Sequence, residues 1–236
     1  MPLTDNQSPP EDKARRIFAK TAGQYDLLNT LMSFGLDILW RRSLVSACNL
    51  EGDEKILDIG TGTGALVFDI LKKYPDVEII GLDPVPQMLQ VAQVRAHQIS
   101  TKARVSFKEG VAEELPFPNQ SFDRIVTAFT LRNFSDRQRS FREVARTLKK
   151  GGKFISLELT RPKNGVLRQL HRVYVKAMIP VYGRMFRNPE AYRYLAETVL
   201  TFPEPEAIRE ELSQVGFGRV EIRTQTFGVT TLHIAK

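Results

Sequence analysis

Short apolar runs separated by amphipathic stretches are the main pattern along this chain. The runs KILDIG at residues 55–60 and VEIIGLD at residues 77–83 predict short, buried strands. Residues 65–74 and 86–98 show the apolar spacing of helices about ten to thirteen residues long. Strands that alternate with helices in this way indicate βαβ units arranged around a parallel sheet.

The rest of the chain continues this α/β pattern. Further strands are predicted at residues 104–110, 122–129 and 153–159, and a further helix at residues 137–149. The tail, residues 219–236, contains two β-rich pieces with no helix between them. This arrangement predicts an antiparallel hairpin on one edge of an otherwise parallel sheet.

The two ends of the pattern define the expected domain. Residues 1–12 are polar, contain Pro9 and Pro10, and are predicted to be disordered. Residues 13–236 are predicted to form a single domain that begins with helical segments. Within it, residues 161–200 are expected to form an inserted helical cap.

Composition narrows the class of protein. With 236 residues, 42% of them hydrophobic, the chain fits one globular domain of ordinary composition. It begins without an apolar segment of signal-peptide type, and no apolar run approaches the roughly 18 residues that span a bilayer. The single cysteine excludes an intramolecular disulfide, and three histidines without close Cys or His neighbours argue against a structural zinc site. We expect a cytoplasmic protein that requires no metal.

The net charge of +7 leaves three explanations: a solvated Arg-rich surface, a nucleic-acid partner or an anionic membrane surface. In the segment Gly165 to Arg187, Arg168, Arg172 and Lys176 recur every four residues opposite an apolar side. A helix of this kind can lie on a membrane, or it can cap an active site with a solvated basic stripe, and both interpretations stay open. Because the basic residues interleave with aliphatic ones, no nucleic-acid partner is expected.

Three glycines at every second position follow the first predicted strand: Gly60, Gly62 and Gly64. They do not form a P-loop, because Ala65-Leu66 stands where a Lys-Ser or Lys-Thr pair is required. They do satisfy the dinucleotide pattern G-x-G-x-x-G/A, so a nicotinamide enzyme remains an alternative at this point.

Two carboxylates bear on that alternative. Asp58 ends the first predicted strand, where it would repel a pyrophosphate and attract a cationic ligand. S-adenosylmethionine carries a sulfonium and an ammonium group and has no phosphate. The glycines would let the backbone approach it closely, and Asp83, at the end of the second strand, can accept hydrogen bonds from both ribose hydroxyls. These residues favour a sulfonium cofactor.

Four segments, in order, resemble class I S-adenosylmethionine-dependent methyltransferases: LDIGTGTG, GLDPVPQML, GVAEELPFPNQSFDRIV and REVARTLKKGGKFISLE. The resemblance implies a Rossmann-like α/β fold, whose seven-stranded, mostly parallel sheet has one antiparallel edge strand, with N-terminal helices and an inserted helical cap. It also implies the following cofactor-binding residues: Asp58, Gly60, Gly62, Thr63, Gly64, Asp83, Val111, Ala112 and Ala128. Val111 stands where such enzymes usually carry an Asn or Asp for the adenine, so that contact would come from the backbone.

The flanking segments resemble a narrower group, the ubiquinone/menaquinone biosynthesis C-methyltransferase family. Residues 146–160, RTLKKGGKFISLELT, are similar to one family signature, and FTLRNFSD carries the pair Arg132-Asn133. Residues 25–40, YDLLNTLMSFGLDILW, are similar to another, but Asp37 replaces its usual His. They keep these signature positions: Tyr25, Asp26, Asn29, Ser33 and Trp40.

This resemblance implies C-methylation of the quinol ring of a polyprenylated quinone precursor, either demethylmenaquinol or 2-methoxy-6-polyprenyl-benzoquinol or both. The partner would be a polyprenyl quinol at the membrane surface, with peripheral contact to the inner face of the cytoplasmic membrane. Two alternatives remain: a methyltransferase for another small aromatic or lipid acceptor, and a non-catalytic S-adenosylmethionine-binding protein. The sequence indicates neither the choice of ring nor the oligomeric state.

Methyl transfer to a ring carbon needs the electron-rich quinol rather than the quinone. The resemblance to the family implies the following roles for side chains of this sequence. A guanidinium is too basic to act as the base, so Arg132 is expected to stabilise the phenolate while Tyr25 orients the hydroxyl. The base is a water, Asp26 or His233. The expected substrate-binding residues are Asn29, Asn133 and His233.

Each of these side chains also has a structural interpretation. Tyr25 could be an aromatic residue that packs on the sheet, and Asp26 and Asn29 could be helix caps. His233 could be a core histidine, because it lies in an apolar strand.

Overall fold

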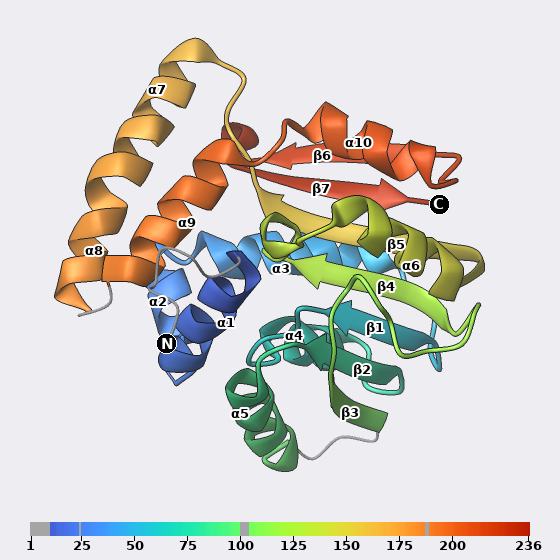
Figure 1. Ribbon diagram of the computed structural model, residues 1–236. Helices are drawn as coiled ribbons and strands as arrows, with labels where there is room; N and C mark the ends of the chain where they lie inside the picture. Colours follow the sequence, from blue (N-terminus) through green and yellow to red (C-terminus); the bar gives the residue numbers. More distant parts are fainter. Residues whose placement is uncertain (1–9, 24, 100–103, 187–188) are drawn as a thin grey trace, which may run out of the picture.

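The computed structural model describes residues 10–23, 25–99, 104–186 and 189–236. Within these residues, the centre of the molecule is a seven-stranded sheet with the order β3-β2-β1-β4-β5-β7-β6 (Figure 1). The strands are β1 Lys55–Ile59, β2 Glu78–Asp83, β3 Arg104–Glu109, β4 Phe122–Ala128, β5 Leu148–Leu159, β6 Val220–Gln225 and β7 Thr230–Ala235. The predicted α/β fold is confirmed, and each predicted strand is present.

Strand direction follows the prediction with one refinement. In the described sheet, β1 to β5 are parallel, and β7 runs against both of its neighbours, β5 and β6. The tail therefore forms the predicted antiparallel hairpin. The reversed strand is the penultimate one, and β6 lies outside it at the edge. This order fits their burial, since every residue of β7 is buried whereas β6 is partly exposed.

Helices cover both faces of the sheet, and a separate apolar layer lies between the helices and the sheet on each face. One layer joins α3 (Leu36–Cys48) and α4 (Ala65–Lys73) to the sheet, and the other joins α6 (Arg137–Thr147) and α10 (Pro205–Gln214). Successive strand residues point to opposite faces, so the central strands contribute to both layers. The helices α4, α6 and α5 (Pro86–His97) match the predicted helices to within two residues at each end.

A helical cap lies beyond the carboxyl ends of β4 and β5 (Figure 1). It consists of α7 Gly165–Val173, the π-helical turn Tyr174–Met178, α8 Ile179–Met185 and α9 Pro189–Thr201, and it packs on α2 Tyr25–Met32 through a separate apolar cluster. Ahead of α2, helix α1 spans Pro10–Thr21 and therefore begins before the expected domain start at residue 13. The rest of the segment predicted to be disordered, residues 1–9, lies outside the described residues.

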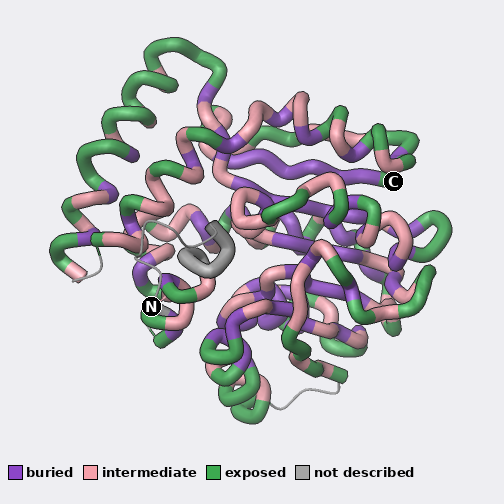
Figure 2. The backbone as a smooth tube through the Cα atoms, in the orientation of Figure 1, coloured by how far each residue is buried: buried purple, intermediate pink, exposed green. Residues whose placement is uncertain are grey.

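Exposure differs sharply between the sheet and the cap. The inner strands β1, β4 and β7 are largely buried, and the edge strands β3 and β6 are partly exposed, whereas α7 is exposed over most of its surface (Figure 2). No residue of α7 is buried. Across the described ranges, no helix combines the length and the apolarity needed to cross a membrane.

Candidate functional site

The glycine-rich loop between β1 and α4 forms one wall of a cavity at the carboxyl edge of the sheet. Gly60, Gly62 and Gly64 all have positive φ, at 70°, 54° and 82°. A Cβ on Gly60 would lie 2.2 Å from Cγ2 of Thr130, so no side chain fits there. Glycine is therefore required at position 60 for two reasons: the positive φ, and the close approach of the segment after β4, which contains Thr130.

Most of the predicted cofactor residues line this cavity, whose volume is about 140 Å³. Those that do are Asp58, Gly60, Gly62, Thr63, Asp83, Val111, Ala112 and Ala128. Gly64 is not among the lining residues, and its predicted cofactor contact stays a prediction. A Cβ on Gly64 would lie 2.8 Å from the ring of Phe68 and 3.3 Å from Cβ of Ala92. Gly64 therefore serves the turn and the packing of α4 against α5.

Asp58 is the least satisfied polar group of the cavity. Its side chain is 1% exposed, and both carboxylate oxygens lack a hydrogen-bond partner within the described residues, as does the nearby Thr61 hydroxyl. Burial raises the pKa of Asp58 to about 7, although the nearby Thr61 hydroxyl acts in the opposite direction without meeting the geometry of a hydrogen bond. A buried carboxylate without partners is costly unless a ligand supplies a donor or a positive charge, so this site fits a cationic ligand.

Asp83 is held in a fixed orientation by the backbone. Its Oδ2 accepts a hydrogen bond from the amide of Gly62 at 2.8 Å, and its Oδ1 accepts one from the amide of Val85 at 2.9 Å. Burial raises its pKa to about 6, although these two bonds act in the opposite direction. Each oxygen keeps a further lone pair, so the carboxylate can also accept two hydroxyl donors.

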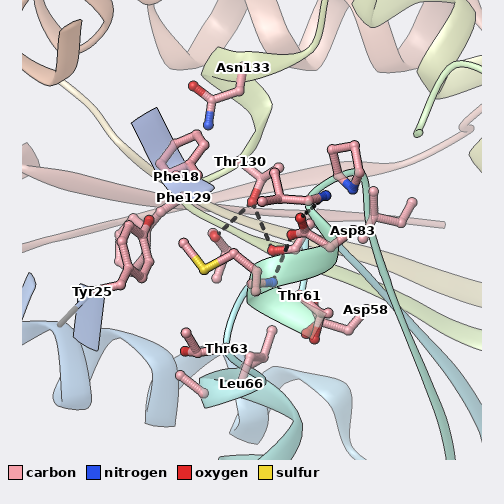
Figure 3. A pocket seen from close by; sticks show the side chains of 18 of the residues that line it. Phe18, Tyr25, Asp58, Thr61, Thr63, Leu66, Asp83, Phe129, Thr130 and Asn133 are labelled. Carbon is pink, nitrogen blue, oxygen red and sulfur yellow. Dashed lines mark hydrogen bonds between the residues drawn. The ribbon is translucent and has the colours of Figure 1, made fainter. Parts of the chain in front are cut away.

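Aromatic residues from α1 and α2 face these carboxylates across the cavity. Figure 3 shows Phe18 and Tyr25 on one side and Asp58 and Asp83 on the other. The rings of Phe18 and Tyr25 pack edge to face with their centroids 5.7 Å apart. The N-terminal helices thus complete a site that the sheet alone leaves open.

Asp26 is engaged in a way that removes it from the candidate bases. Its Oδ1 accepts a hydrogen bond from the Thr63 hydroxyl at 2.7 Å, and its Oδ2 pairs with the guanidinium of Arg95 at 2.5 Å. It lines the cofactor cavity and fastens α2 to the glycine-rich loop. We therefore correct its predicted catalytic role to a positioning role.

A second, larger cavity of about 390 Å³ lies between the sheet and the cap. Its walls are mostly apolar and come from α2, α3, η3 (Thr226–Gly228), α7 and α9. Four residues line both this cavity and the cofactor cavity: Tyr25, Asn29, Asp37 and Phe129. The two cavities therefore meet at the start of α2 and the end of β4.

A buried ion pair lies at this junction. Arg132 lines the second cavity, and its Nη1 lies 2.5 Å from Oε1 of Glu158; their side chains are 5% and 0% exposed. The amide of Arg132 also donates to Oε2 of Glu158 at 3.2 Å. Burial alone would lower the pKa of Arg132, but Glu158, with smaller contributions from Tyr25 and Tyr194, raises it. The guanidinium thus remains charged in an almost dry position.

Tyr25, Asn29 and Asn133 lie near Arg132, and their predicted roles stay predictions. Burial raises the pKa of Tyr25, while Arg132 and the Asn29 amide act against that rise. Asn29 lines both cavities, and Asn133 lines the cofactor cavity, where its Oδ1 accepts a hydrogen bond from the hydroxyl of Tyr194 at 3.0 Å. Tyr25 consequently keeps its hydroxyl protonated beside a fixed positive charge.

The structure does not bring His233 to the site. His233 is fully buried in β7, and its Nε2 lies 2.9 Å from the carbonyl oxygen of Pro205 at the start of α10. Burial lowers its pKa to about 4. The predictions that it binds substrate or acts as the base were wrong, and its alternative interpretation as a core histidine is confirmed.

Some site residues were missed or left without a role. Glu158 could have been found, since it is a carboxylate near the end of an apolar strand, the same signal that marked Asp58. Asp37 lies at the junction, where it accepts hydrogen bonds from the Ser33 hydroxyl at 2.8 Å and from Arg41 at 2.6 Å. Tyr194 lies in YRYLAETV, residues 192–199, a segment similar to the family, but its role depends on how α9 packs. Within the described ranges, no cluster of three or more His, Cys, Asp or Glu residues could hold a metal.

Comparison with known proteins gives a consistent result. The model of the ubiE/COQ5 methyltransferase family matches residues 6–236. Demethylmenaquinone methyltransferase of Deinococcus radiodurans is 36% identical over 98% of this chain and 97% of that protein. Ubiquinone/menaquinone biosynthesis C-methyltransferase UbiE of a Geobacter species is 35% identical over 94% of this chain and 95% of that protein. The fold is similar to that of a methyltransferase of Aquifex aeolicus, with a TM-score of 0.59, 16% identity, and coverage of 83% of this chain and 88% of that one.

Proposed function

Since the chain belongs to the ubiE/COQ5 methyltransferase family and is an S-adenosylmethionine-dependent methyltransferase, we propose that it methylates a ring carbon of a polyprenylated quinol. Relatives named for demethylmenaquinone and for ubiquinone/menaquinone biosynthesis support a quinone precursor as the acceptor. The nicotinamide alternative is thereby set aside, because the family uses a sulfonium cofactor.

The polar cavity fits S-adenosylmethionine, which supplies an electrophilic methyl group when bound. We assign Asp58 to the ammonium group, because a buried carboxylate without a partner gains most from a charged donor. Asp83, held by two backbone amides, would accept the ribose hydroxyls. Val111 and Ala112 would contact the adenine through their backbone.

The apolar cavity fits the acceptor. A quinol ring at the junction would contact Tyr25, Asn29 and Phe129, and a prenyl chain would lie along the apolar walls toward α7. Such burial supplies affinity from the tail, while the ring is held where the two cavities meet. Holding both reactants in place could supply roughly 7 kcal/mol or more of the barrier.

Arg132 would act on the charge that develops as the ring reacts. Deprotonation of the quinol hydroxyl pushes electron density onto the ring carbon, and a phenolate beside the buried guanidinium is stabilised. Tyr25 would orient this hydroxyl. With Asp26 paired and His233 in the core, water is the remaining predicted acceptor for the hydroxyl proton.

The observation that carries this proposal is the meeting of a polar and an apolar cavity at Tyr25, with the Arg132–Glu158 pair buried beside it. The test is transfer of labelled methyl from S-adenosylmethionine to demethylmenaquinol and to 2-methoxy-6-polyprenyl-benzoquinol, with and without reductant. We expect label in the lipid phase only under reducing conditions, and the ratio of the two rates identifies the preferred ring. Transfer to a soluble catechol but to neither quinol would contradict the proposal.

A further inference from the structure

Two phenylalanines project from tight turns at the opening of the acceptor cavity. Phe34, between α2 and α3, is 74% exposed, and Phe227, in η3, is 82% exposed. Both line the cavity, and both have a left-handed backbone, with φ of 53° and 57°. Bulky residues rarely adopt this conformation, so each turn holds its ring outward at a cost in conformational energy.

These turns are fixed to the rest of the cavity wall. The indole Nε1 of Trp40 donates a hydrogen bond to the hydroxyl of Thr226, next to Phe227, at 2.8 Å. The ring of Phe34 lies 6.0 Å from that of Tyr174, whose hydroxyl donates to the carbonyl oxygen of Met32 at 2.6 Å. These contacts hold the ring of Phe34 and the turn that carries Phe227.

Helix α7 extends the same apolar surface. Val166, Leu170 and Val173 recur at the spacing of one helix face, and each is more than half exposed. Leu170 also lines the cavity, so this face is continuous with its wall. Figure 2 shows α7 exposed along most of its length. Exposed apolar residues that gather in this way mark an interaction surface.

Charge indicates the chemistry of the partner. The segment 165–187 contains five Arg or Lys residues and no Asp or Glu, within a chain of net charge +7. Arg172, Lys176 and Arg184 are exposed on the same helical segment, whereas Arg168 pairs with Glu204 at 2.7 Å. A surface that combines apolar side chains with an excess of cations matches an anionic bilayer.

We propose that Phe34, Phe227 and the α7 residues Val166, Leu170 and Val173, here called the docking face, insert into an anionic lipid bilayer. The opening of the acceptor cavity then faces the acyl chains, and the acceptor enters without crossing water. This inference rests on the proposed polyprenyl acceptor for its purpose, but the insertion itself can be measured without any acceptor.

The test is co-sedimentation of the full chain with vesicles of phosphatidylglycerol and phosphatidylcholine, and with vesicles of phosphatidylcholine alone, with no quinol or cofactor added. We compare wild type with two double variants, Phe34→Ser with Phe227→Ser and Val166→Asp with Val173→Asp. Val94→Asp is the matched control, because Val94 is 57% exposed but lies on α5, away from the cap. We expect wild type and control to bind the anionic vesicles, and both double variants to partition about tenfold more weakly.

A second readout separates docking from catalysis. Val166 and Val173 do not line the acceptor cavity, so their double variant should methylate a quinol that lacks the prenyl tail at the wild-type rate. Its rate on a polyprenyl quinol in anionic vesicles should fall with its vesicle binding. Wild type that stays in the supernatant with anionic vesicles, or double variants that bind as tightly as Val94→Asp, would overturn the docking face. Absence of methyl transfer to every quinol, with vesicle binding intact, would instead overturn the proposed function.

Discussion

The cofactor cavity and the acceptor cavity meet at Tyr25 but are lined by different parts of the chain. The cofactor cavity is formed mainly by the segments that follow β1 to β4, and its shape depends on backbone groups and on Gly60, which leaves no room for a side chain. Residues of the N-terminal helices close its open side. The acceptor cavity is formed by side chains from helices that precede and follow the sheet strands in the chain. Most of the first cavity is thus specified by local loops at the sheet edge, whereas the second exists only after the cap has packed.

This difference makes the junction the most sensitive part of the molecule. Arg132 and Glu158 are 26 residues apart in the chain and are both nearly excluded from solvent. Neither charge is tolerable there without the other, because a single buried charge costs far more than the pair. The experiments below change one region at a time and ask whether the effect stays on that side of the junction.

The largest effect is expected when the partner of Arg132 is removed. Glu158→Ala leaves a buried guanidinium unpaired, which should lower the free energy of unfolding by about 3–5 kcal/mol and should lower kcat by about a hundredfold or more. Urea unfolding and steady-state kinetics measure the two effects. The control is Glu211→Ala, which breaks the partly exposed pair with Arg137 and should cost about 1 kcal/mol or less. Equal destabilisation by the two variants would contradict the special role of the buried pair.

The next largest effect is expected in the glycine-rich loop, where substitutions should lower the affinity for S-adenosylmethionine but not for the acceptor. Gly60→Ala places a Cβ 2.2 Å from Thr130 at a positive φ, whereas Gly62→Ala has the positive φ alone and open space around its Cβ. We expect S-adenosylmethionine affinity to fall about a hundredfold for Gly60→Ala and about tenfold or less for Gly62→Ala. Isothermal titration calorimetry gives both values. Similar losses for the two variants would mean that strain, rather than the close approach of Thr130, dominates.

A smaller loss is expected at the ribose position. Asp83→Ala removes the acceptor that two backbone amides hold in place, and it should weaken S-adenosylmethionine binding by about 1–3 kcal/mol. The affinity for the quinol acceptor should stay within about twofold of wild type, because Asp83 does not line that cavity. Calorimetry that shows unchanged cofactor affinity would remove Asp83 from the site.

The smallest effect is a pH dependence that belongs to Asp58. Burial raises the pKa of its carboxyl from the ordinary 3.8 to about 7, so the charged form that attracts a cation is lost as the pH falls through 7. S-adenosylmethionine affinity should therefore drop about tenfold between about pH 8 and about pH 6. The variant Asp58→Asn should bind more weakly at about pH 8 and lose most of this slope. A wild-type affinity that is flat over this range would contradict an ionised Asp58 at the ammonium group.

The difference between the two cavities also explains what the sequence could predict. Asp58 and Asp83 each end a recognisable strand, and parallel strands bring such ends to one edge, so their meeting follows from local pattern. Arg132, identified from the family resemblance, likewise follows the end of a strand, β4. The docking of α7 and α9 over the sheet follows from no local pattern, so the role of Tyr194 was not visible.

The errors have physical reasons as well. His233 was placed near the substrate from the family resemblance, which does not reveal what its side chain contacts. In the structure its ring points to α10 and meets the Pro205 carbonyl. Asp26 was correctly placed near the site, yet its pairing with Arg95 on α5 depends on a long-range contact. Gly64 fitted the motif, but the structure also requires glycine there for packing, because a Cβ would lie 2.8 Å from the Phe68 ring.

The central claim is that Arg132 acts at the junction in the transition state rather than as part of the cofactor cavity. The most direct measurement is kcat with demethylmenaquinol for Arg132→Ala and Arg132→Lys, with S-adenosylmethionine affinity measured on the same samples. We expect Arg132→Ala to lower kcat about a hundredfold, or about 3 kcal/mol. Arg132→Lys should recover only part of that rate, because an ammonium cannot reproduce the planar fork. Cofactor affinity should stay near normal in both, and near-wild-type turnover in Arg132→Ala would contradict the account.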